Sequence, residues 1–211
     1  KHPRAKARTN GSAMRVAVSF SVIIPMAAQE PEPTALFHSL GSAIEIILSQ
    51  EAGRAASLNA GAAKATGTYL WFLHADSSLP DDAWQKLQQA IADKPKALHY
   101  FDLAFAGGGW VMKINSWGAN MRARFFGCPF GDQGFCIEKQ LFEAIGAYPE
   151  TAPYGEDHLF VWQAHKAGVK LNRVPAKLTT SARKYQQNGW LRTTLLHQYL
   201  WIKQLMSVKC Q

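Results

Sequence analysis

The sequence predicts an α/β fold, in which a mainly parallel central sheet lies between two layers of helices and a helical tail follows at the C-terminus. Three observations support this. Short apolar runs alternate with helical segments, which is the order produced by βαβ units. Polar or glycine-rich residues directly follow several of these runs, where ligands bind at the carboxyl edge of such a sheet. The length of 211 residues fits one compact unit of this class.

The first strand is expected at Ser19–Ile24, because this run is β-branched and aromatic and Pro25 ends it. A basic stretch followed by an apolar one is also typical of a secretory signal, and the basic residues at 1–15 precede an apolar run at 16–28. The alternating pattern downstream favours the strand.

The remaining elements follow from periodicity and from breaking residues. An alanine-rich helix containing Gly61 suits close packing on a sheet, and Asp81 and Asp82 favour a helix start. Further strands are predicted at Ile44–Leu48, Tyr69–Leu73, Ala97–Ala106, Phe135–Ile137 and Val169–Val174. Helices are predicted at Thr34–Leu40, Ala52–Thr66, Asp81–Asp93, Trp110–Phe126, Lys139–Ile145, Glu156–Ala167 and Trp190–Val208.

The charge balance indicates an anionic partner. The chain has 23 Lys and Arg against 15 Asp and Glu, a net charge of +8. A nucleotide diphosphate, a nucleic acid or an acidic membrane would each suit this excess. Part of it lies in residues 1–18, which we interpret as a basic arm. No nucleic-acid-binding motif accompanies the charge, so no nucleic-acid partner is expected.

The cysteines and the apolar runs bear on location. Cys128, Cys136 and Cys210 form no CxxC pair, so neither a disulfide framework nor a zinc site is indicated, and a reducing cytoplasm is the simpler interpretation. No apolar run reaches the roughly 18 residues that span a bilayer. Any membrane contact is therefore expected to be peripheral, at the inner face.

Two acidic elements are candidates for chemistry. His74 and Asp76 follow an apolar strand, and if the chain stays extended both side chains face one ligand, such as Mg²⁺ or Mn²⁺ with two phosphate oxygens. Glu156 and Asp157 open a helix, whose dipole keeps a general base ionised. Taken alone, the first element is explained equally well by an ordinary turn, and the second is explained better by helix capping.

Other polar residues accompany these acids. Arg54 offers a planar guanidinium that matches a phosphate, and Asn59 is a polar residue among small ones. Asp132 and Gln133 lie in a glycine-flanked loop that suits the wall of a site for a hydroxylated acceptor, although a simple turn is the alternative.

In order and spacing these stretches resemble the inverting family 2 glycosyltransferases, which have the GT-A fold, a Rossmann-like three-layer sandwich. They are SVIIP (21–25), GRAASLNAGAAKATG (53–67), YLWFLHADS (69–77), GDQGFCIEKQLFEAIGAYPE (131–150), GEDHLFVWQAHKAG (155–168) and TTSARKYQQNGW (179–190). The LHAD strand end, GDQ loop and SAR tail resemble a bacterial subgroup of transferases associated with radical-SAM and selenodomain proteins or with arsenosugar biosynthesis.

The resemblance implies a role for each candidate. It makes Asp76 the acid that binds the metal and the diphosphate, with His74 where the first acid usually stands. It makes Asp157 the catalytic base beside Glu156, and places Arg54 near the donor; Asn59, five residues further on, is predicted from its residue type to bind the donor as well. Asp132 and Gln133 become acceptor-side groups, and Arg183 and Tyr185 belong to a tail that resembles a closing lid. The implied ligands are a nucleotide-diphosphate sugar and a Mn²⁺ or Mg²⁺ ion.

The chain departs from the family pattern after Ile44–Leu48. There the family has a DGGS-like turn, a helix and a further strand, whereas only residues 49–52 precede the GR element here. Recognition of the nucleotide base therefore has no assignable residue, and a non-catalytic module that binds nucleotide sugars or a membrane surface stays an alternative.

The expected organisation is a catalytic domain at 19–188 and an amphipathic helix at 189–211. That helix is apolar and aromatic with interspersed basic residues. Such a stripe packs against the body, a second subunit or a membrane interface, and the sequence does not choose among them.

Overall fold

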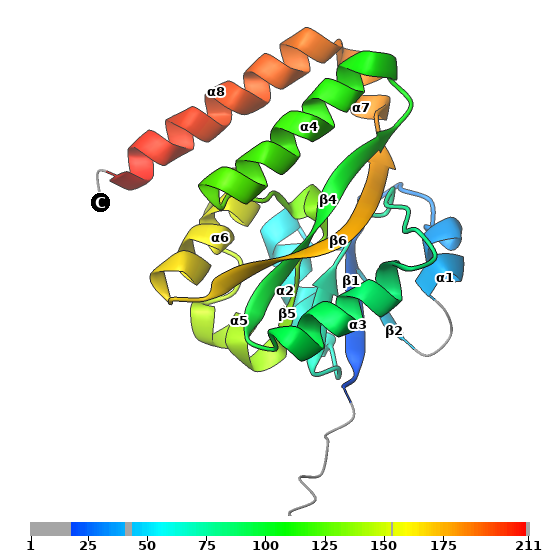
Figure 1. Ribbon diagram of the computed structural model, residues 1–211, viewed down its shortest axis with the longest axis vertical. Coiled ribbons are helices and arrows are strands. Elements are labelled where there is room, and N and C mark those ends of the chain that lie inside the picture. The colour runs from blue at the N-terminus through cyan, green and yellow to red at the C-terminus, as the bar shows by residue number, and fades with distance from the viewer. Residues whose placement is uncertain (1–17, 41–43, 153, 210–211) are drawn as a thin grey trace, which may run out of the picture.

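The computed structural model describes residues 18–40, 44–152 and 154–209, and within them helices cover both faces of a six-stranded sheet (Figure 1). The strands are β1 (Phe20–Pro25), β2 (Glu45–Ser49), β3 (Tyr69–Phe72), β4 (Ala97–Ala106), β5 (Cys136–Glu138) and β6 (Lys170–Ser181). The helices are α1 (Thr34–Leu40), α2 (Arg54–Lys64), α3 (Ala83–Asp93), α4 (Gly109–Phe126), the 3-10 turn η1 (Gly131–Gln133), α5 (Lys139–Ile145), α6 (Glu156–Lys166), α7 (Arg183–Asn188) and α8 (Trp190–Lys209). Apart from Val18, the predicted basic arm lies outside the described residues.

The strand order is β2-β1-β3-β5-β4-β6. β1 pairs in parallel with β2 and β3, and β4 pairs in parallel with β6, while β5 runs antiparallel between β3 and β4. The prediction of a mainly parallel α/β sheet is therefore confirmed. β1, β2 and β3 bring their carboxyl ends to one edge, which places the residues after β3 there.

Alternate residues of the strands pack into two cores, one on each face of the sheet. On one face, Ile23 and Phe72 pack with residues of α2, α5 and α6. On the other face, Val22 and Trp71 pack with residues of α1 and α3. The result is the three-layer sandwich that the apolar runs predict, and it holds the carboxyl edge of the sheet rigid.

The last strand was predicted too short. We expected it to end at Val174, but β6 continues to Ser181, and α7 follows it where the sequence indicated only a tail. Pro175 signals a strand end in the sequence, yet β6 lies at the sheet edge, where a proline is tolerated. The register with β4 shifts between Phe101 and Asp102, so a bulge accommodates the extra residues.

The small-residue helix α2 packs closely on β1, as expected from its composition. A Cβ atom built on Gly61 would overlap the Cγ2 atom of Ile23, which is fully buried. We therefore expect Gly61→Ala to lower the free energy of unfolding by about 1–3 kcal/mol through overpacking. Gly118→Ala in α4 is the matched control, because open space surrounds that glycine.

The control should be neutral or raise stability by up to about 1 kcal/mol through helix propensity. Chemical denaturation of both variants measures the difference. Equal stabilities would show that α2 has room to move away from the sheet.

Candidate functional site

The predicted site residues gather at the carboxyl edge of the sheet, where β3 ends and where α2, η1 and α6 begin (Figure 1). Arg54, the first residue of α2, is central to this group. Its Nη2 atom contacts Nε2 of His74, and its Nε atom lies 3.0 Å from Oε1 of Glu156. The fold thus brings together three candidates that lie far apart in the sequence.

His74 is a neutral imidazole in this arrangement. Burial, and then the adjacent Arg54 guanidinium, lower the pKa of His74 to about 3. Because the guanidinium only donates hydrogen bonds, Nε2 must be the accepting nitrogen and Nδ1 must carry the proton. A neutral imidazole is the form that binds metals, but Arg54 already occupies Nε2.

Asp157 is held as a carboxylate at the start of α6. Its Oδ2 atom accepts a hydrogen bond of 2.7 Å from the Gly131 N–H, and its Oδ1 atom accepts one of 2.9 Å from the His158 N–H. Burial raises the pKa of Asp157, but His158, Arg54 and these two N–H donors together bring it below its usual range. Such a group is ionised at neutral pH, which a general base requires.

Gly131 allows η1 to approach this carboxylate. A Cβ atom at this position would lie 3.1 Å from Nη2 of Arg54 and 3.3 Å from Oδ2 of Asp157. A glycine at position 131 therefore lets the backbone of the GDQ loop (131–133) approach both Arg54 and Asp157 closely.

Asp132, the next residue, has the opposite electrostatic environment. Its Oδ1 atom is buried and has no hydrogen-bond partner among the described residues. Burial raises the pKa of Asp132 to about 6; Asp157 also raises it, whereas Arg122 and Arg54 act in the lowering direction. A buried acceptor atom without a donor, close to a base, suits an incoming hydroxyl group.

Arg122 of α4 belongs to this part of the site, although it was not predicted from the sequence. Its Nη2 atom is buried without a hydrogen-bond partner in the described structure. Its Cζ atom lies 3.2 Å from the centroid of the Phe130 ring, which packs against the ring of His158 at 3.8 Å. A second arginine, Arg124, lies on the same helix and pairs elsewhere, so residue type alone could not have identified Arg122.

Two predicted ligand-binding residues instead hold loops. Gln133 is fully buried, and its Nε2 atom donates to Phe101 O at 2.9 Å. The Asn59 amide donates to Tyr148 O at 2.9 Å and to Glu150 Oε1 at 2.8 Å, and it accepts from the Tyr148 N–H at 3.0 Å. Both side chains support the walls of the site from behind.

Asp76 lies away from His74. β3 ends at Phe72 and a turn follows, in which the Ser77 N–H donates to His74 O at 3.0 Å, so the extended geometry that we assumed for His74 and Asp76 is wrong. Asp76 instead accepts hydrogen bonds from the Thr180 hydroxyl at 3.1 Å and the Ser181 N–H at 3.3 Å, which tie it to the end of β6.

The donor set fits a cation shared with a ligand better than a cation held by protein alone. The described residues contain no group of three or more His, Cys, Asp or Glu side chains placed to hold a metal ion. Asp76 is exposed and has carboxylate lone pairs beyond its two hydrogen bonds. Mg²⁺ is commonly held in this way, by one or two carboxylates together with substrate phosphates and water.

The predicted tail residues differ in position. Tyr185 of α7 lies close enough to Asp132 that this carboxylate adds to burial in raising the pKa of Tyr185 to about 12, so its hydroxyl keeps its proton. Arg183 is exposed at the start of α7, outside the contacts that join Arg54, His74 and Glu156.

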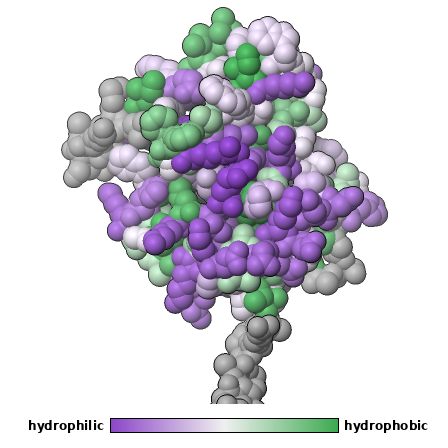
Figure 2. Space-filling model, in the orientation of Figure 1, coloured by the Kyte–Doolittle hydropathy of each residue, from purple (hydrophilic) through white to green (hydrophobic). Residues whose placement is uncertain are grey.

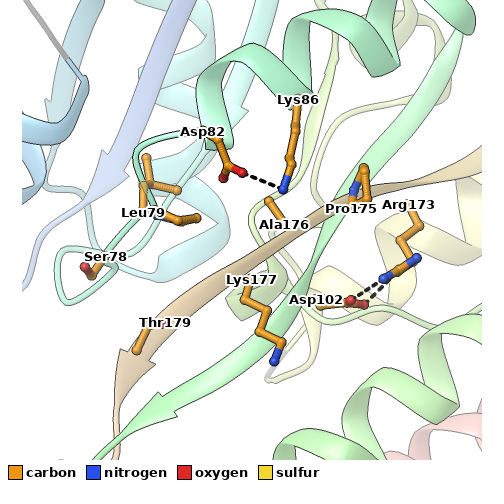
Figure 3. Close-up of a pocket in the computed structure, with 11 residues that line it drawn as sticks. Ser78, Leu79, Asp82, Lys86, Asp102, Arg173, Pro175, Ala176, Lys177 and Thr179 are labelled. Atoms are coloured by element: carbon orange, nitrogen blue, oxygen red, sulfur yellow. Dashed lines mark hydrogen bonds and ion pairs between the residues drawn. The ribbon is translucent and has the colours of Figure 1, made fainter.

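A hollow of about 540 Å³ adjoins the site between α3 and β6, beginning at Ser78 and Thr179 (Figure 3). Its charged groups are largely paired with each other. Lys86 Nζ lies 2.6 Å from Asp82 Oδ2, and Arg173 Nη2 lies 2.6 Å from Asp102 Oδ2. The first pair lies at the start of α3 and the second joins β6 to β4 beside the bulge, so we assign the hollow a structural role.

Comparison with known proteins supports the architecture. The family model described as glycosyl transferase family 2 matches residues 31–145, more than half of the chain. This range includes Arg54, His74, Asp76 and Asp132 but ends before Asp157. No curated protein matches the chain in sequence.

Solved structures share the fold at low sequence identity. S. aureus TarS residues 1–349 align with a TM-score of 0.59 and 15% identity over 78% of this chain and 60% of that one. The same protein in complex with UDP-GlcNAc aligns with a TM-score of 0.59 and 14% identity over 77% and 58%. GalNAc-T7 with UDP, GalNAc and Mn²⁺ aligns with a TM-score of 0.55 and 15% identity over 78% and 44%. The chain thus spans less than two thirds of each of these structures, which have the three-layer fold described above.

Proposed function

Because the chain belongs to glycosyl transferase family 2, we propose that it moves a sugar from a nucleotide-diphosphate donor to an acceptor hydroxyl, with inversion at the anomeric carbon. The observation that carries this proposal is the pair of carboxylates at one edge of the sheet. Asp157 is ionised and Asp132 has a buried oxygen without a donor, and both act electrostatically with Arg54. The complexes of similar folds with UDP-GlcNAc and with UDP, GalNAc and Mn²⁺ support the choice of donor class.

In this mechanism Asp157 takes the proton from the acceptor hydroxyl as that oxygen attacks the anomeric carbon, and the bond to the diphosphate breaks. One displacement inverts the configuration at that carbon. Asp132 accepts a hydrogen bond from the acceptor, and the Tyr185 hydroxyl donates one. Gln133 supports this wall through its bond to Phe101 O.

On the donor side, Arg54 is proposed to bind the diphosphate through its guanidinium, and Glu156 fixes the orientation of that guanidinium by their ion pair. Asp76 would hold a divalent cation shared with the diphosphate, while the neutral His74 ring, which lies beside Arg54, would donate a hydrogen bond to phosphate. Such a cation supplies charge neutralisation for the leaving diphosphate. Asn59 contributes by anchoring the loop at Tyr148.

The proposal extends to the organisation of the chain. The catalytic unit is residues 19–188, followed by the amphipathic terminal segment 189–211, as the motif spacing predicts. The LHAD, GDQ and SAR motifs support a place in the radical-SAM-associated or arsenosugar subgroup. A cytoplasmic location would agree with the buried free thiols of Cys128 and Cys136.

A melting-temperature screen of nucleoside diphosphates with Mn²⁺ tests the proposal. The cognate nucleotide at about 100 times its dissociation constant should stabilise the chain by about 2.7 kcal/mol, and a chelator should remove much of the gain. Asp76→Asn should lose the metal-dependent part. Asp81→Asn, which removes an exposed carboxylate that does not line the adjoining hollow, should keep it.

Release of nucleotide from the cognate sugar donor is the second measurement. Binding without turnover, for any hydroxylated acceptor supplied, would favour the non-catalytic module. The absence of stabilisation by every nucleoside diphosphate would contradict the proposal.

A further inference from the structure

The terminal helix α8 packs with its polar side inward. Thr193 and Gln204 are buried, and His197 is partly covered. Asn115 Nδ2 of α4 donates to Thr194 Oγ1 at 3.1 Å, and Gln204 Nε2 donates to Tyr154 O at 3.0 Å. α8 therefore lies along α4 and is held to the body by hydrogen bonds (Figure 1).

The outward side of this helix pair is apolar, the reverse of an ordinary surface helix. Hydrophobic side chains gather at the end of the molecule formed by α4 and α8, whereas hydrophilic ones predominate at the opposite end (Figure 2). Eight large side chains of these two helices are each more than half exposed. They are Trp110, Trp117, Phe125 and Phe126 of α4 and Leu191, Leu195, Leu196 and Tyr199 of α8. We call them the outer apolar face.

The charges around the outer apolar face have one sign. α4, α7 and α8 contain no Asp or Glu, and no acidic residue follows Asp157 in the chain. Lys113, Arg192 and Lys203 are exposed on α4 and α8. The face therefore combines apolar and aromatic groups with a positive potential.

We propose that the outer apolar face is a docking surface for an anionic membrane. Two helices lying flat, with tryptophan and tyrosine among the apolar groups and basic residues beside them, suit the headgroup region of a bilayer. Within the described residues no helix is long and apolar enough to cross a membrane, so the contact is one of docking.

A second copy of the chain fits this face less well. A symmetric dimer would bring the same patch together from both subunits. The basic residues of one subunit would then lie near those of the other, and these helices have no acidic residue to pair with them. The basic residues are Lys113, Arg192 and Lys203. An anionic headgroup layer supplies the missing charge, at about 1 kcal/mol for each basic residue near the surface, or roughly fivefold in partitioning.

Vesicle flotation of the full chain tests the proposal without any need for activity. We expect the protein to float with vesicles of phosphatidylcholine and phosphatidylglycerol, and to partition at least about tenfold less onto phosphatidylcholine alone or at high salt. Trp117→Ser combined with Leu195→Ser should weaken partitioning by at least about tenfold. Leu48→Ser, at an exposed position of β2, is the matched control and should float normally.

The charge contribution has its own pair of variants. Lys113→Glu with Lys203→Glu should lower partitioning by at least about tenfold, whereas Lys64→Glu on α2 should not. Unchanged melting temperatures would show that the variants are folded. Equal flotation of the double variants and their controls would overturn the proposal, as would failure of the parent chain to float. Self-association that is lost in the same variants, without flotation of the parent chain, would assign the face to a second copy.

Discussion

Asp157→Asn should lower the rate of sugar transfer by about 10²–10⁴-fold, the usual contribution of a general base. The affinity for the nucleotide diphosphate should change little, because Arg54 and Asp76 make the proposed donor contacts. Single-turnover kinetics over a range of donor concentrations separates the two effects, since the maximal rate constant should fall while the donor concentration that gives half of that rate stays within a few-fold.

The contacts of Asp157 determine which control is needed. Both of its oxygens accept backbone N–H groups, from Gly131 and His158. Asparagine keeps one acceptor oxygen but turns an NH₂ group toward the other donor, so part of the loss could come from a displaced GDQ loop. A crystal structure or an unchanged nucleotide affinity would exclude that displacement, and Asp81→Asn reports the effect of removing an exposed carboxylate elsewhere. Undiminished transfer would remove Asp157 from the mechanism.

Asp132→Asn should stabilise the chain at neutral pH and slow transfer at the same time. The folded state raises the pKa of Asp132 from 3.8 to about 6, so it holds the proton more tightly than the unfolded state does. The favourable contribution of Asp132 is therefore complete below about pH 4 and lost as the pH rises through 6. Two pKa units correspond to about 3 kcal/mol, an upper limit because Arg122 loses its counter-charge in the variant.

Denaturation of the two proteins between pH 4 and 8 measures this effect. The stability difference should be absent at the acid end and largest above pH 6, while kcat/KM falls by about tenfold or more if Asp132 binds the acceptor. Asp81→Asn, an exposed carboxylate before α3, should show neither trend. A variant that is both less stable and fully active would contradict the role given to Asp132.

Much of the fold could be read from the sequence because local signals and tertiary packing agree. β4 and α5 have the predicted bounds, since glycines follow the first and a helix-forming run makes up the second. The predicted strand ended at Val174, directly before Pro175. A proline is compatible with a strand at a sheet edge or at a bulge, and edge position is a property of the whole sheet.

The site was predictable where a residue type has few structural uses. Arg54 and Glu156 were both selected as candidates from the sequence, and the structure adds that they form an ion pair at the starts of two helices. Gln133 was predicted to contact the acceptor, but its amide bonds to Phe101 O of β4. A glutamine in a glycine-rich loop can hydrogen-bond either a ligand or a neighbouring strand, and its residue type does not decide between them. Arg122 could not be predicted, because the burial of its side chain depends on how η1 packs against α4.

Gln204 connects the outer apolar face with the candidate functional site at the start of α6. It lies on α8 beneath the outer apolar face, its amide donates to Tyr154 O and Gly155 O, and its Oε1 lies 3.1 Å from Nδ1 of His158, the neighbour of the base. The helix that we propose to meet a membrane therefore also supports the first turn of α6, where Gln204 contacts His158 and where His197 interacts electrostatically with the proposed base Asp157. A change in the seating of α8 should consequently alter the surroundings of Asp157.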